Sequence, residues 1–186
     1  MRIYSGVARN RRQDLNTAFG LTDRPDYFGG SGAVPTSQTI FGHSVYLYAG
    51  ETVSNIICCV TTAASGTTPT SLRLGLWDSG TPTCLAVTPE LSADSRWTST
   101  AWKVNALSAN YQVPTDGVYY AAFFINGVFG TTNLQLLTVN LAGQINNLIG
   151  SGKRPTTSLK TAAASMAAGD TGTYGAGVVV PWLGVS

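Results

Sequence analysis

The stretch that decides the fold contains LRLGLWDSGTPTCLAVTPELSADSRWTSTAWKVNAL (residues 72–107) and then YQVPTDGVYYAAFFING (residues 111–127). Short runs of Leu, Val, Tyr, Phe and Trp are separated by turn-forming clusters such as DSGTP, LSADS and VPTDG. Strands cut by turns at intervals of roughly 8–12 residues are typical of an all-β sandwich or barrel. We therefore predict an all-β fold, an antiparallel β-sandwich of the jelly-roll type.

The strongest strand is predicted at residues 118–125. Its side chains are apolar on both faces, which indicates a position at the centre of a sheet. The turn dipeptides Asp116-Gly117 and Asn126-Gly127 precede and follow it. We expect both faces of this strand to be covered.

Two neighbouring segments predict how the sheet continues. In residues 71–78 (SLRLGLWD) Leu recurs at every second position, so we expect one face to pack against the core. Arg73 and Trp77 then lie on the opposite face. Residues 83–91 (TCLAVTPEL) follow a tight turn, and Pro89 indicates an edge strand or a strand end.

The remaining strands are predicted with less regular patterns. We expect strands at residues 40–50, 53–63 and 99–107, and a last strand at 175–185 that lies beside an early one. The first of these places Tyr46 on the face opposite Val45 and Leu47. After residue 130 the pattern fits one or two strands, or a short helix near 144–148. The Ala-rich residues 159–170 fit either a helix or irregular structure.

The first 40 residues differ from the rest of the chain. They contain the turn-rich segment GGSGAVP (29–35), which favours neither helix nor strand. We predict an extended N-terminal arm over residues 1–40 and a β-sandwich domain over residues 41–186. We expect the arm's arginines to bind acidic patches on a neighbouring subunit rather than nucleic acid, because a guanidinium binds a carboxylate through two hydrogen bonds. These arginines are Arg2, Arg9, Arg11, Arg12 and Arg24.

Charge is scarce in this sequence. Charged residues make up 11% of the chain, whereas roughly 25% is usual in soluble domains. Such a composition suits a protein that packs against copies of itself or a neighbour, and it also suits an ordinary Ser/Thr-rich β-protein. The net charge of +2 is too small to imply nucleic acid. No secretory signal and no membrane span is recognisable, so we expect a soluble protein made in the cytosol.

No residue pattern predicts catalysis. His43 is the single histidine, and the nine acidic residues are scattered through turns, so we predict no enzyme, no metal site and no cofactor. Three cysteines, two of them adjacent, do not fit a disulfide framework. We expect either Cys58 or Cys59 to face the core, and a bridge from one of them to Cys84 is an open alternative.

Residues 44–140 resemble a β-sandwich module that recurs in structural proteins of tailed bacteriophages. The similarity lies in SVYLYAGETVSNIICCVTTAAS (44–65), in the Leu-Ala-Val-Thr and Trp-Thr-Ser-Thr motifs of 72–107, and in YQVPTDGVYYAAFFINGVFGTTNLQLL (111–137). The resemblance covers about half of the chain and keeps the order of the elements. It implies a virion protein of the head-decoration, minor-tail or fibre type.

This resemblance implies a protein, made in the host cytoplasm, that decorates or reinforces the assembled particle through multivalent contacts with other virion proteins. It also implies a homo-oligomer, with a trimer favoured by analogy with other jelly-roll proteins. The alternative is a tail or tail-fibre module that binds a host cell-surface glycan. The aromatic residues that could stack on a sugar, or instead fill the core or an interface, are Tyr46, Trp77, Trp97 and Trp102.

Overall fold

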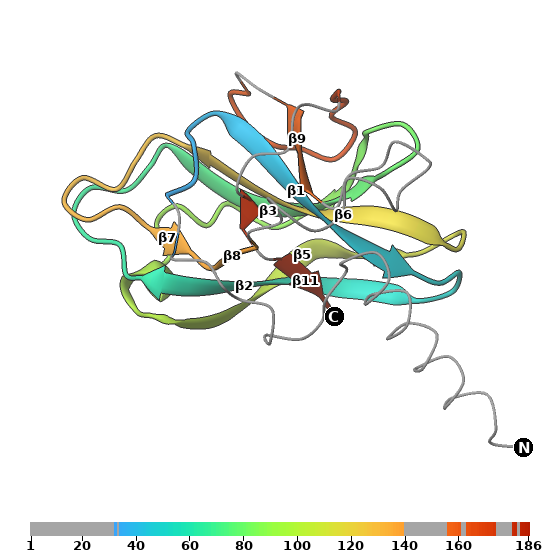
Figure 1. Cartoon of the computed structure of the whole chain (residues 1–186), viewed down its shortest axis with the longest axis horizontal. Coiled ribbons are helices and arrows are strands. Elements are labelled where there is room, and N and C mark those ends of the chain that lie inside the picture. Colours follow the sequence, from blue (N-terminus) through green and yellow to red (C-terminus); the bar gives the residue numbers. More distant parts are fainter. Residues whose placement is uncertain (1–31, 33, 140–155, 161–162, 174–179, 182) are drawn as a thin grey trace, which may run out of the picture.

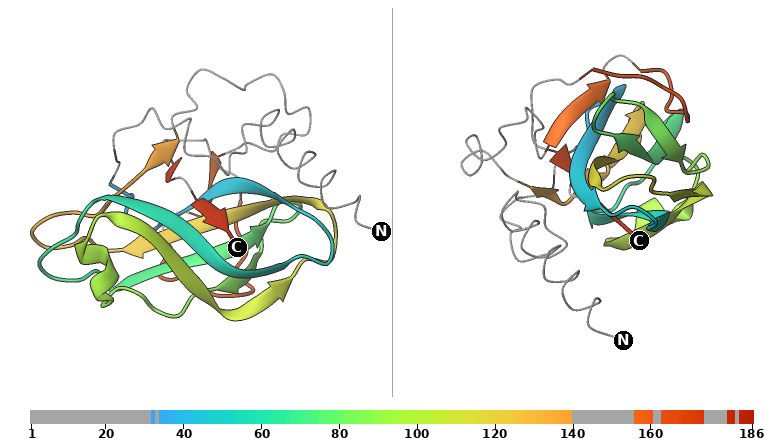
Figure 2. Two further views of the ribbon diagram at one scale, coloured as in Figure 1. Left: turned by 90° about the horizontal axis from the view of Figure 1, so that it is seen from below. Right: turned by 90° about the vertical axis from the view of Figure 1, so that its right-hand side faces the viewer.

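Strands dominate the computed structural model of the chain, which describes residues 32, 34–139, 156–160, 163–173, 180–181 and 183–186 (Figure 1). They pack as two antiparallel sheets, so the predicted all-β sandwich is confirmed (Figure 2). A short 3-10 helix, η2 (Ser95–Thr98), precedes β5. The strands are β1 (Thr39–Leu47), β2 (Thr52–Thr62), β3 (Ser71–Asp78), β4 (Cys84–Val87), β5 (Ala101–Gln112), β6 (Gly117–Asn126), β7 (Gln135–Leu136), β8 (Thr138–Val139), β9 (Thr156–Lys160), β10 (Val180–Pro181) and β11 (Leu183–Val185).

The larger sheet has five strands in the order β4-β3-β6-β1-β9. Strand β6 lies at its centre, as its two apolar faces predict, and residues 119–125 are all buried. Strand β4 is an edge strand that ends two residues before Pro89, which is the outcome that Pro89 predicts. A proline there removes no hydrogen bond from the sheet, because it lies beyond the last paired residue.

The second sheet has the order β11-β2-β5, and β7 also pairs with β2. Its last strand in the sequence, β11, lies beside the early strand β2, with Leu183 opposite Cys58, as predicted. Strands β8 and β10 form a separate two-stranded pair. Strand β5 pairs only with β2 among the described residues, which makes it an edge of this sheet.

The main core lies between the two sheets. The alternating leucines of β3 face it, with Phe123 of β6, Ile56 of β2 and Leu183 of β11. The opposite face of the five-stranded sheet is also covered, by a smaller cluster that contains Trp77, Phe124 and Leu159. Both faces of β6 are therefore buried, and Trp77 lies on the face of β3 that the alternation predicts.

The Ala-rich segment after β9 is irregular rather than helical over its described residues 163–173. Its backbone N–H groups bond to distant carbonyls, for example Gly169 to Cys84 and Gly172 to Pro82. These tertiary hydrogen bonds replace the local ones that a helix would need. Residues 1–31, with the five arginines of the predicted arm, and residues 144–148 lie outside the described part of the chain.

The three cysteines are free thiols, so the alternative of a bridge to Cys84 is excluded. Cys58 is buried and the adjacent Cys59 is half-buried, because consecutive residues of a strand point to opposite faces. Burial raises the pKa of Cys58 and of Cys84 to about 12, so both thiols stay protonated and inert at neutral pH.

Candidate functional site

His43 acts as a structural residue between the two sheets. Its side chain is fully buried, and its Nδ1 lies 2.9 Å from the carbonyl oxygen of Leu183 in β11. Burial lowers the pKa of His43 to about 4, against the smaller opposing effect of that hydrogen bond. The imidazole is therefore neutral at pH 7 and out of reach of a substrate in solvent.

The described residues hold no group of three or more His, Cys, Asp or Glu side chains that could bind a metal ion. Within the same residues, no helix is both long enough and apolar enough to cross a membrane.

Two of the four aromatic residues predicted as surface candidates lie in the core. Trp77 and Trp97 are 0% exposed, so the expectation that they stack on a sugar is wrong and the core-filling alternative holds for both. Their indole N–H groups have internal partners: Trp97 donates to the Leu91 carbonyl (2.7 Å) and Trp77 donates to Met166 Sδ (3.3 Å). Trp102 is 47% exposed and Tyr46 is half-buried.

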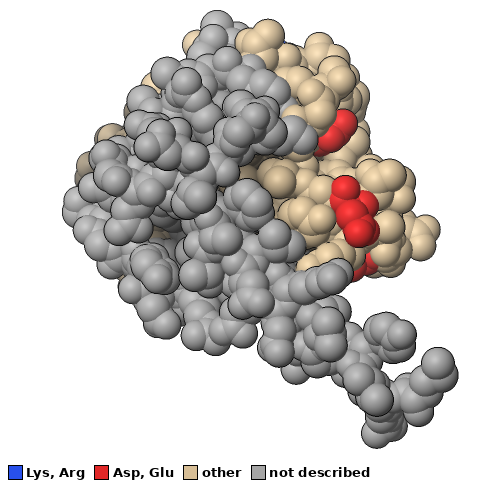
Figure 3. Space-filling view, turned by 45° about the vertical axis from the view of Figure 1, so that its right-hand side comes forward, with Lys and Arg blue, Asp and Glu red and all other residues tan. Residues whose placement is uncertain are grey.

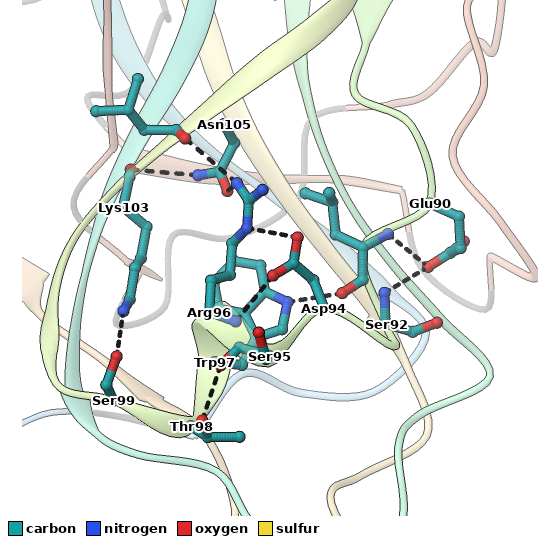
Figure 4. A network of polar contacts seen from close by, with 12 residues as sticks. Glu90, Ser92, Asp94, Ser95, Arg96, Trp97, Thr98, Ser99, Lys103 and Asn105 are labelled. Atoms are coloured by element: carbon teal, nitrogen blue, oxygen red, sulfur yellow. Dashed lines mark hydrogen bonds and ion pairs between the residues drawn. The ribbon is translucent and has the colours of Figure 1, made fainter.

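A polar network around η2 holds Trp97 in place (Figure 4). Asp94 caps the helix by accepting from the Arg96 N–H (2.8 Å), and its other oxygen pairs with Arg96 Nε (2.7 Å). The Arg96 guanidinium then donates to Asn105 Oδ1 on β5 (2.9 Å). These charged side chains satisfy one another, which is what a structural network requires.

Glu90 forms a second structural clamp, between the end of β4 and the start of β3. Its carboxylate accepts hydrogen bonds from the Leu72 N–H (2.6 Å), the Ser71 hydroxyl (2.7 Å) and the Ser92 N–H (3.0 Å). Burial raises the pKa of Glu90, but these bonds and the Arg73 guanidinium outweigh it and lower the pKa to about 2. The carboxylate is held ionised, which excludes it as a general acid.

The first part of strand β5, residues 102–105, is inverted relative to the usual rule for a half-buried strand, whereas Leu107 further along the inward face lies in the core. Lys103 and Asn105 point inward and are buried, whereas Trp102 and Val104 point outward and are 47% and 56% exposed. The network around η2 makes this arrangement tolerable, because Lys103 Nζ donates to Ser99 (2.9 Å) and Asn105 also donates to the Ile56 carbonyl (3.1 Å). Departures from the local pattern are expected at functional or strained sites.

The neighbouring strand extends this apolar surface. Ile57 lies opposite Val104, Cys59 opposite Trp102, and Asn55 opposite Ala106. Directly paired residues point to the same side of a sheet, so these side chains share the outer face. We name the set Trp102, Val104, Ala106, Ile57 and Cys59 the Trp102 face.

A second surface lies where three strand connections meet, at the right-hand end of the sandwich in Figure 1. Hydrogen bonds tie these connections together: the Ala49 N–H donates to Asp116 Oδ1 (2.7 Å), and the Gly50 N–H donates to the Val113 carbonyl (2.8 Å). Asp78, at the end of β3, lies opposite Tyr119 of β6. We name the aromatic and acidic residues of this surface the tyrosine end: Tyr46, Tyr48, Tyr111, Glu51, Asp78 and Asp116. Tyr119 itself is buried in the main core.

The tyrosine end has a negative electrostatic character. Burial raises the pKa of Tyr46, and the charge of Asp116 raises it further. Burial also raises the pKa of Tyr111, with added effects of Tyr119 and of the charge of Asp78. Figure 3 turns this end forward, and the charged side chains visible on its described surface are acidic.

The sequence patterns missed most of these residues. Tyr46 and Trp102 were predicted as candidates, whereas Val104, Tyr48, Asp78 and Asp116 were not. The only signal available was the alternation of AWKVNA, in which apolar residues at every second position indicate a face without saying which way that face points.

No family model, no curated protein and no solved structure matches this chain. The fold is that of an all-β sandwich with two distinct surfaces, one apolar and one aromatic and acidic.

Proposed function

We propose that this protein is a structural component of a bacteriophage particle, which it decorates or reinforces through protein–protein contacts. The inverted strand β5 carries this proposal, because it exposes Trp102 and Val104 while Lys103 and Asn105 occupy the interior. The resemblance of residues 44–140 to a module of tailed-phage structural proteins supports the setting.

The Trp102 face favours contact with a folded protein. Burying a large apolar side chain contributes roughly 1.5–3 kcal/mol, so two half-exposed residues give a weak contact by themselves. A weak contact that is repeated over many copies on a lattice gives strong overall attachment. The occupant we propose is a subunit of the particle lattice, since the scarcity of charge in this chain suits a surface that is covered after assembly.

The outer edge of β5 is less suited to strand addition. Two features of β5 discourage pairing between sheet edges. Lys103 points inward, and the register with β2 is irregular between Val53 and Asn55, where β5 carries extra residues. The contact is therefore made by the face of the sheet rather than by its edge.

The rival proposal is a tail or fibre module that binds a host glycan. Sugar sites combine an aromatic ring with hydrogen-bonding groups that recognise hydroxyls. On the outer face near Trp102 lie the apolar side chains of Ile57 and Val104 and the thiol of Cys59, and the amide of Asn55 on this face already donates to the Ser186 hydroxyl. The chemistry at Trp102 therefore favours a protein partner over a sugar.

The test is the composition of purified particles of the phage that encodes the chain. We expect the protein to be present in many copies by quantitative mass spectrometry, and an antibody label to place it on the particle surface. Trp102→Ser with Val104→Thr should reduce incorporation at least tenfold. The matched control is Val128→Thr, because Val128 is 54% exposed but lies in the connection after β6.

Absence of the protein from purified particles would contradict the proposal. Binding of the purified chain to a glycan array, lost on Trp102→Ser, would instead support the glycan module.

A further inference from the structure

The first part of β5 fits two registers with β2. In AWKVNA (residues 101–106) apolar and polar side chains alternate, and in the observed register Trp102 lies opposite Cys59 on the outer face. A shift of one residue would pair Trp102 with Cys58 or Val60 instead, whose side chains lie in the main core. Such a shift turns every side chain of the segment to the other face. The shifted register would therefore bury the apolar side chains of this segment and expose the polar ones.

An irregularity in the pairing of β5 with β2 leaves room for this shift. Residues 101–106 pair regularly with β2, and the pairing resumes at Tyr111. Between these two blocks β2 contributes Ser54 alone, whereas β5 contributes residues 107–110. Unpaired residues of a bulge can take up a change of register, so the first block can shift without the second. Hydrophobic burial favours the shifted register, because it removes Trp102 from water.

The Arg96 guanidinium opposes this shift (Figure 4). One of its terminal nitrogens donates to the Val104 carbonyl (3.3 Å) and to Asn105 Oδ1 (2.9 Å), so Arg96 binds both the backbone of β5 and its inward side chain. Its Nε pairs with Asp94 Oδ2 (2.7 Å). These bonds are specific to the observed register, because a shift of one residue would carry the Asn105 side chain to the outer face, away from Arg96.

Arg96 is held in place independently of β5. Its own N–H donates to Asp94 Oδ1 (2.8 Å), which caps the helix η2. The next residue, Trp97, is fully buried, and its indole N–H donates to the Leu91 carbonyl (2.7 Å). The Trp97 carbonyl accepts the Ala64 N–H (2.8 Å). The guanidinium therefore has a fixed position on the sandwich, against which it can hold the strand.

We propose that Arg96 is the positioning residue of the Trp102 face. Its bonds to Val104 and Asn105 hold residues 101–106 in the register that directs Trp102 outward. Without these bonds the segment shifts by one residue and withdraws the face. The inference rests on the proposed function in one respect, since it explains how the proposed contact surface is presented. The direction of the segment is a property of the isolated chain, so it is tested without particles.

Chemical modification of the purified full chain measures which way the segment points. Val104→Cys places a thiol on the outer face, and Lys103, which is 8% exposed, supplies an amine on the inner face. We call the chain with Val104→Cys the reporter chain. A maleimide modifies the thiol, an acylating reagent modifies the amine, and mass spectrometry of peptides gives the rate at each position. We expect the thiol at position 104 to react fast and Lys103 to react slowly.

Arg96→Met in the reporter chain removes the donors of the guanidinium and keeps an unbranched side chain. The rate at position 104 should fall and the rate at Lys103 should rise, each by about tenfold or more, because the two positions exchange their environments. Unfolding gives a different result, since it raises both rates. The buried thiols of Cys58 and Cys84 report it directly, because they react only when the sandwich opens.

A second change separates the positioning of the strand from general support of the fold. Asn105→Val places an apolar side chain on the inner face, so that hydrophobic burial there favours the observed register. Arg96→Met with Asn105→Val should therefore restore the two rates of the reporter chain. The matched control is Arg73→Met, which removes the ion pair with Glu90 (3.2 Å) and should leave both rates unchanged.

Three results would overturn the inference. The first is that Arg96→Met leaves both rates unchanged. The second is that it raises both rates together with the rate at Cys58, which would mean that Arg96 supports the fold as a whole. The third is that Asn105→Val fails to restore the rates. If the rates change as expected but chains with Arg96→Met enter particles normally, the positioning role stands and the proposed contact through the Trp102 face is contradicted.

Discussion

Strands β6 and β5 are both long and both contain aromatic residues, yet they have opposite environments. Strand β6 is hydrogen-bonded to β1 on one side and β3 on the other, and both of its faces are covered. Within the described part of the chain, strand β5 pairs with β2 alone, and it exposes Trp102 and Val104. The number of strands and segments packed around a strand, rather than its own hydrophobicity, decides whether its aromatic residues are buried or exposed.

The largest expected effect tests the burial of β6. Phe123→Ala should lower the free energy of unfolding by about 3–5 kcal/mol, because it removes a fully buried ring and leaves a cavity. Denaturant unfolding of the purified protein measures this loss. A loss below about 1 kcal/mol would show that β6 is not central and would remove the contrast with β5.

The second effect tests His43, which lies opposite Ala121 of β6. Burial lowers the pKa of His43 from 6.5 to about 4. As the pH falls, His43 is therefore protonated in the unfolded chain at a higher pH than in the folded chain. Stability that is fully present above pH 6.5 should therefore fall as the pH drops toward 4, by about 3 kcal/mol in total.

Unfolding free energies measured between pH 7 and pH 4.5 check this dependence, and His43→Gln should make it shallower. Protonation of Glu90 also lowers the stability, but at a lower pH, between its usual pKa of 4.5 and about 2. The contribution of His43 can therefore be separated from that of Glu90. A wild-type stability that stays level between pH 6.5 and 4.5 would contradict the buried position of His43.

The third effect concerns the inward face of β5. Asn105→Ala should cost about 1–3 kcal/mol, since it leaves the Ile56 carbonyl and part of the Arg96 guanidinium without their partner. Thermal unfolding of this variant beside Ala106→Ser, on the exposed face of the same strand, measures the difference. Equal stability of the two variants would argue against the inverted orientation of β5.

The smallest effect concerns the outward face of β5. Val104→Thr should change the free energy of unfolding by less than about 0.5 kcal/mol, because the side chain is more than half exposed. The same variant should weaken particle incorporation if the Trp102 face is a contact. A destabilisation above about 2 kcal/mol would mean that the chain itself covers this face.

Local patterns were sufficient for much of the fold. Leu at every second position of β3, the two apolar faces of β6 and the turn signals around β6 all depend on neighbours in the sequence, and the structure confirms each of them. The adjacent cysteines likewise point to opposite faces, because alternation is a property of any strand. Pro89 marked the edge strand for an equally local reason, since a proline has no N–H to donate.

The candidate surfaces could not be predicted in the same way. The alternation in AWKVNA determines which residues share a face. The polar face can be the inner one because Arg96 and Ser99 supply hydrogen-bond partners for Asn105 and Lys103. Ala49 and Asp116 are 67 residues apart in the sequence and meet through a single hydrogen bond. The sequence by itself determined the strands and their turns, because period and turn chemistry act between near neighbours. The tertiary structure decided which side of β5 is buried and which carboxylates meet the tyrosines, because both depend on the order of strands in the two sheets.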